Sequence, residues 1–146
     1  MKNENIGITL HQLKIFWTVA QASSFTKASK ILGFQWGKCY NFNDNAMDSS
    51  PLLEVVKAIE KAKNTYRPTL VYTHSVADLN VDHRVVANAV LTAFRPKPSE
   101  ICKELRLFEV ASATDYGNSA ITGLFKPNLF INITNKWDVK SKALLA

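Results

Sequence analysis

The chain has 146 residues, 47% of them hydrophobic and 21% charged, which suits one globular domain and excludes a disordered chain. Its net charge of +6 arises mainly in residues 1–43, which hold five of the 18 basic residues and one acid, without a dense basic block. No apolar run approaches the roughly 20 residues of a membrane helix, so we expect a cytoplasmic protein that binds neither membranes nor nucleic acid.

Residues 9–33 carry the pattern of two helices separated by a short break. Ser23 and Ser24 mark the end of the first helix and the start of the second, which Gly33 can terminate. The apolar faces are spaced for helices and comprise Leu10, Leu13, Trp17 and Ala20 in the first, and Phe25, Ala28, Ile31 and Leu32 in the second.

From residue 38 onward, short apolar runs alternate with amphipathic segments. The pattern predicts strands at 39–42, 69–73, 105–110 and 128–133, and helices at 51–63, at 82–94 and from Trp137 onward. Alternating strands and helices are typical of βαβ units. We therefore expect an α/β fold with a mainly parallel sheet flanked by helices.

One polar segment stands between the predicted strand at 69–73 and the helix that follows it. It contains five polar or ionisable side chains within ten positions, namely His74, Asp78, Asn80, Asp82 and His83. In α/β folds, ligand sites lie at the carboxyl ends of parallel strands, where this segment is expected. Ordinary structural roles also fit, with Asp82 as a helix N-cap and His74 as a hydrogen-bonded histidine at a strand end. Spacing alone leaves both interpretations open, because no second pair of ligands with a recognisable spacing occurs.

The same segment, T-H-x-x-x-D-L-N-V-D-H-R, resembles the second signature of the PIG-L/LmbE family of zinc-dependent N-deacetylases. The blocks F-N-D-N-A-M-D-S-S-P-L-L-E-V-V, L-F-E-V-A-S-A-T-D and F-K-P-N-L-F-I-N-I are also similar to that family and follow in its order. The resemblance covers about residues 29–146. It implies a Rossmann-like fold, one zinc ion, and hydrolysis of an N-acetyl group on a small amino-sugar substrate.

The resemblance also implies roles for individual residues. The histidine before Arg84 in the signature is a zinc ligand, which makes His83 the expected metal ligand. Asp82 and Asn80 are the expected catalytic residues, although Asn80 stands where other members have histidine.

Four further residues are expected to contact the substrate, namely Asn43, Asp44, Asp78 and Arg95. Asn43 and Asp44 are equally ordinary turn residues, and Arg95 suits the C-terminal end of a helix.

The family's first signature, A-H-P-D-D-E, does not occur in this sequence. In the family it supplies two zinc ligands and the aspartate that acts as base. His83 alone cannot hold a catalytic zinc ion, which needs about three protein ligands, and we do not expect His11, His74, Asp78 or Asp82 to replace the missing ones. We therefore expect a chain that is inactive by itself. Its sheet should be truncated at the N-terminal strands and prone to self-association through unpaired edges.

Residues 8–33 instead resemble the opening of a LysR-type DNA-binding domain, in I-T-L-H-Q-L-K-I-F-W-T-V-A-Q-A-S-S-F-T-K-A-S-K-I-L-G. The resemblance ends before the recognition helix that would enter the major groove. We expect two domains, residues 1–33 with two short helices and residues 34–146 with a partial deacetylase fold. The alternatives are a fragment of a LysR-type regulator or a non-catalytic partner subunit.

Overall fold

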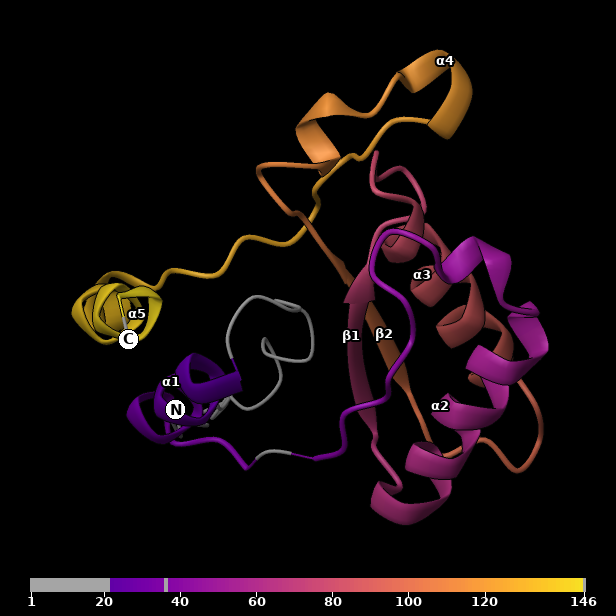
Figure 1. Ribbon diagram of the computed structural model, residues 1–146, viewed down its shortest axis with the longest axis horizontal. Coiled ribbons are helices and arrows are strands. Elements are labelled where there is room, and N and C mark those ends of the chain that lie inside the picture. Colours follow the sequence, from indigo (N-terminus) through magenta and orange to yellow (C-terminus); the bar gives the residue numbers. More distant parts are fainter. Residues whose placement is uncertain (1–21, 36, 146) are drawn as a thin grey trace, which may run out of the picture. The chain divides into compact units, whose positions relative to one another are not determined.

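The computed structural model describes residues 22–35 and 37–145, with the backbone alone at 22–26 (Figure 1). The chain divides into two units, residues 1–37 with 130–146 and residues 38–129. The first predicted helix lies almost wholly outside the described residues.

The first unit pairs two short helices, α1 (Ala22–Leu32) and α5 (Trp137–Leu144). Gly33 ends α1 as expected, with a φ of +66° that favours glycine. The amide of Gly33 donates to the carbonyl of Lys30 (3.2 Å) and that of Phe34 to the carbonyl of Ser29 (3.0 Å), the two bonds of a Schellman cap. The helices predicted before Gly33 and from Trp137 onward are confirmed, but Ser23 and Ser24, predicted to separate two helices, lie inside α1.

The second unit is built on a strand, helix, strand sequence. It comprises α2 (Leu52–Tyr66), β1 (Leu70–His74), α3 (Val81–Ala93) and β2 (Glu104–Phe108), together with the short helices η2 (Met47–Ser49), η3 (Thr114–Tyr116) and α4 (Ser119–Thr122). The two strands pair in parallel, from Leu70 opposite Glu104 to His74 opposite Phe108. A parallel pair joined through a helix confirms the predicted α/β fold. Among the described residues each strand pairs only with the other, so their outer edges are unpaired.

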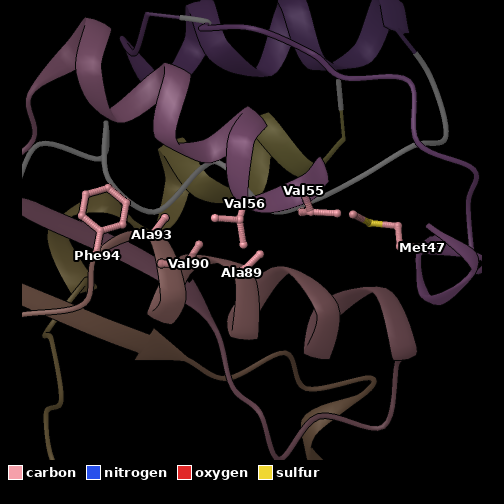
Figure 2. Packing of buried hydrophobic residues seen from close by; sticks show 7 residues of the cluster. All are labelled: Met47, Val55, Val56, Ala89, Val90, Ala93 and Phe94. Carbon is pink, nitrogen blue, oxygen red and sulfur yellow. The ribbon is translucent and has the colours of Figure 1, made fainter. Parts of the chain in front are cut away.

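The core lies between α2, α3 and one face of the sheet. Seven buried residues form it, namely Met47, Val55, Val56, Ala89, Val90, Ala93 and Phe94 (Figure 2). The paired residues Val71 and Leu105 pack against this cluster from the sheet. Because side chains alternate along a strand, the next pair, Tyr72 and Arg106, belongs to the other face, where the guanidinium donates to the tyrosine hydroxyl (2.8 Å). This packing anchors the N-terminal end of α3 beside the carboxyl end of β1.

Two predicted strands are wrong. Residues 39–42 and 128–133 have no regular secondary structure and pair with no strand among the described residues. Tyr40 is partly exposed and donates its hydroxyl hydrogen to the carbonyl of Ala58 (3.0 Å), while Phe130 is 81% exposed. Both segments have the composition of strands without a neighbouring edge to complete them.

No helix in the described part of the chain is both long enough and apolar enough to cross a membrane.

Candidate metal centre

Three ionisable side chains meet at the carboxyl end of β1. His74 is the last residue of the strand and is 1% exposed, and Asp78 lies in the following loop with no exposed surface. His83 stands in the first turn of α3, with 17% of its side chain exposed. The strand, the loop and the helix start therefore deliver one group each to the edge where α/β folds bind ligands.

The two imidazole rings are stacked, and the carboxylate lies against one of them. The ring centroids of His74 and His83 are 3.8 Å apart with an interplanar angle of 7°. Nδ1 of His83 lies 3.0 Å from Oδ2 of Asp78, but the direction of the ring nitrogen does not meet hydrogen-bond geometry. That nitrogen is buried and has no hydrogen-bond partner among the described residues. Two potential ligand atoms thus lie in close contact without a hydrogen bond between them.

Asp78 is held by groups from two different loops. Its Oδ1 accepts the backbone N–H of Asn80 (2.9 Å), and its Oδ2 accepts the hydroxyl of Thr114 (3.0 Å). The Thr114 hydroxyl oxygen in turn accepts the N–H of Val110 (2.8 Å). Further along, a Cβ added to Gly117 would collide with the carbonyl oxygen of Ala77, so the loops after β1 and β2 pack backbone against backbone. The carboxylate is thus fixed in place by tertiary contacts.

Asn80 caps α3. Its side-chain oxygen accepts the N–H groups of Asp82 (2.8 Å) and His83 (3.3 Å), which are otherwise unpaired at a helix start. Its amide nitrogen also donates to Asn45 (3.3 Å). The cap holds His83 in the first turn, and a catalytic role for Asn80 stays a prediction.

Asp82 joins α3 to the loop that precedes η2. Its two carboxylate oxygens accept the backbone N–H of Asn45 (2.7 Å) and of Met47 (3.0 Å). The sequence suggested an N-cap or a catalytic group for this residue, but Asn80 is the cap. The carboxylate of Asp82 is engaged with backbone, and its catalytic role also stays a prediction.

The remaining predicted substrate contacts fall in two places. Asn43 and Asp44 are exposed on the loop that Asp82 holds, next to Asn45. Arg95 lies just beyond the C-terminal end of α3, whereas His83 lies in its first turn. Nη1 of Arg95 is 3.9 Å from Oε1 of Glu60. The helix rises about 1.5 Å per residue, which puts the backbone of Arg95 roughly 18 Å from that of His83. The structure does not bring Arg95 into the group.

Burial controls the protonation of His74. Desolvation, reinforced by the neighbouring His83 and opposed by Asp78, lowers the pKa of His74 from 6.5 to about 3. The imidazole is therefore neutral at physiological pH, the form that ligates metals.

A comparison with known protein families identifies the family of this chain. The family model of GlcNAc-PI de-N-acetylase, PIG-L, matches residues 18–94, just over half of the chain. The chain belongs to the PIG-L family. No curated protein and no solved structure matched the chain.

The PIG-L match covers β1, α3 and all three residues of the group. It begins at residue 18, within the segment that resembles LysR-type regulators, and it ends before β2. The predicted relation to this family is thereby confirmed, and a deacetylase-like function follows from it.

The residues of this PIG-L chain suit a metal ion. One ligand atom from each of His74, Asp78 and His83 lies within 4.8 Å of the other two. Two imidazoles and a carboxylate are a donor set of catalytic zinc sites. The buried nitrogen of His83 faces a buried carboxylate oxygen and forms no hydrogen bond within the described part of the chain, and this observation favours an ion there.

Two members of the site were not predicted to act there. The sequence left a metal-binding and a structural role open for His74, which belongs to the family-like signature, but we did not expect it to replace a missing ligand. Thr114 lies 36 positions from Asp78, and the family-like block L-F-E-V-A-S-A-T-D that contains it gave no indication of a contact with Asp78.

Proposed function

We propose that this chain is a zinc-dependent N-deacetylase domain that acts on a small N-acetylated amino sugar. The observation that carries the proposal is the group His74, Asp78 and His83 at the carboxyl end of β1 in a PIG-L chain. Bound zinc polarises an amide carbonyl and lowers the pKa of a bound water. The family relation supports the substrate class, and the donor set supports the metal.

In this proposal His83 holds the metal, and Asp82 and Asn80 order its surroundings. The carboxylate of Asp82 ties the loop at 43–47 to the first turn of α3, so exposed Asn43 and Asp44 stay near the site and can contact the sugar. Asn80 holds the backbone of His83 through the helix cap. Substrate binding thus depends on a loop that is positioned by the same helix turn as the metal ligand.

We further propose that the chain by itself does not turn over substrate. The sequence lacks A-H-P-D-D-E, and the family resemblance places the general base in that signature. Among the described residues, the carboxylate nearest to His83 is that of Asp78, which is buried and already accepts two hydrogen bonds. A base must reach the proton that it removes, and this carboxylate is poorly placed to do so.

The experiment combines substrate binding with acetate release. Zinc-loaded protein is titrated with an N-acetylglucosamine conjugate while the amide NMR signals of residues 43–47 and 74–83 are followed, and acetate is measured by a coupled assay. We expect saturable shifts of these signals, with no acetate. The matched control is the corresponding glucose conjugate, which lacks the acetamido group and should shift them far less.

The three outcomes separate the parts of the proposal. Binding without acetate supports both parts. Acetate release that His83→Gln abolishes supports the deacetylase function and refutes the inactivity of the isolated chain. Neither binding nor release, from protein that carries metal, refutes the proposed substrate class.

A further inference from the structure

Among the described residues, no lysine or arginine balances the negative charge of the buried Asp78 carboxylate. The carboxylate has no exposed surface, and none of these basic side chains forms an ion pair with it. The guanidinium of Arg84 donates to the backbone carbonyl of Asp78 (2.9 Å) and not to the carboxylate. A buried carboxylate without a cation is costly, even when hydrogen bonds from Asn80 and Thr114 offset part of that cost.

The two histidines offer nitrogen ligands beside this carboxylate. Nδ1 of His83 is 3.0 Å from Oδ2 of Asp78, and ligand atoms bound to one tetrahedral zinc ion are roughly 3.4 Å apart for metal–ligand bonds of about 2.1 Å. The two ligand atoms that lie farthest apart are at most 4.8 Å apart. Binding of one ion therefore shortens their separation by no more than roughly 1.4 Å. The stacked rings of His74 and His83 must also tilt apart, because parallel rings do not direct their lone pairs to one point.

From these contacts we infer that His74, Asp78 and His83 together bind one divalent transition-metal ion, so that this chain holds a metal without A-H-P-D-D-E. The inference deepens the proposed function, because it names a complete set of three protein ligands with an open position. It revises the expectation that His83 stands alone. The ion supplies positive charge at Asp78, and two imidazoles with one carboxylate suit zinc, cobalt or iron(II).

The direct test measures metal binding without substrate. Metal-free full-length protein is titrated with Zn²⁺ in competition with a chromophoric chelator, and with Co²⁺ while its visible absorption is recorded. We expect one ion per chain and intense Co²⁺ bands typical of four-coordinate sites. Failure of the chain to bind either ion at micromolar concentration would overturn the inference.

Three variants remove one ligand each with little change in shape. His74→Phe keeps an aromatic ring in the stack, Asp78→Asn keeps an acceptor for the backbone N–H of Asn80, and His83→Gln keeps a polar side chain in the first turn. Each should lower the affinity for Zn²⁺ about 100-fold or more, because loss of a supporting residue outside the ligand set already costs 10- to 100-fold. An unchanged affinity in any one of the three refutes this ligand set.

Two matched controls change an aspartate and a histidine that lie outside the proposed ligand set. Asp48→Asn alters an exposed carboxylate in η2, and His11→Phe removes the third histidine of the chain. Both should bind Zn²⁺ as the parent protein does. A loss of affinity in His11→Phe would mean that His11 is a ligand and would overturn the three-residue set.

A spectroscopic count keeps the inference testable if a variant does not fold, which circular dichroism would reveal. Zinc-edge X-ray absorption of the parent protein should show two imidazole ligands with oxygen in the remaining positions, and a count of one or none contradicts the set. The result is independent of the acetate assay. Metal binding without substrate binding refutes only the proposed substrate class, whereas substrate binding by a chain that takes up no metal refutes the ligand set and the zinc dependence but not the substrate class.

Discussion

At the scale of single residues, His74 shows how burial changes the meaning of a histidine. The sequence left a structural and a metal-binding role open for this histidine, and in the structure it stacks on His83 and approaches Asp78. Desolvation holds its pKa near 3, so it is neutral wherever the protein is folded at ordinary pH. Phe108 packs on its ring from β2, with centroids 4.8 Å apart.

This pKa predicts a pH dependence of folding in metal-free protein. Between pH 6.5 and about 3, His74 is protonated in the unfolded state but not in the folded state. The free energy of unfolding should therefore decrease as the pH is lowered through this window. His74 should change the free energy of unfolding by up to about 1.4 kcal/mol per pH unit in this window. Above pH 6.5 it should contribute no pH dependence. Urea unfolding of the parent and of His74→Phe should diverge below pH 6.5, because the variant lacks this group while Asp78 and His83 remain. Parallel curves would show that His74 does not titrate this way.

At the scale of elements, the first turn of α3 organises the site. Asn80 caps the helix, Asp82 binds the preceding loop, and His83 carries the ring that faces Asp78. All three lie in one signature because one helical turn holds them together. The sequence showed the signature, but it did not show that Asn80 caps the helix while Asp82 binds the preceding loop.

We predict that Asn80→Ala destabilises the protein by about 1 kcal/mol, since it leaves two helix N–H groups without the cap. Asn80→Asp should retain most of the stability, because aspartate caps equally well. The same substitution on the same helix, Asn88→Ala, is the control and should be neutral or slightly stabilising, as alanine is the better helix former. Chemical denaturation measures all three. Equal effects at positions 80 and 88 would contradict the cap.

The strands mark the limit of prediction at this scale. Periodicity and composition predicted β1, β2, α2 and α3 to within a few residues, because one face of each packs in or against the apolar cluster. They also predicted strands at 39–42 and 128–133, which the structure lacks. A strand exists only where a second segment offers its backbone, and no local pattern contains that partner.

At the scale of the whole molecule, the candidate site belongs to one unit. His74, Asp78, His83 and Thr114 all lie within residues 38–129. The unit contains its own apolar cluster between α2, α3 and the sheet. Neither the site nor this cluster includes a described residue of the first unit.

We therefore predict that a fragment of residues 38–129 binds Zn²⁺ with the affinity of the full chain. Circular dichroism of the fragment checks that its helices form, and the competition titration measures the affinity. His83→Gln in the fragment is the control and should lose binding. A folded fragment that binds no metal would show that the other unit contributes to the site.

The sequence by itself determined the family, the α/β class and the segment that carries the chemistry, because these depend on local patterns and on a contiguous signature. Only the tertiary structure decided which side chains meet. His74 and Asp78 became partners of His83 because β1 ends beside the start of α3. Thr114 reached Asp78 because parallel pairing of β1 and β2 brings their following loops to the same edge of the sheet. Contacts between distant segments arise from packing, which no short stretch of sequence encodes.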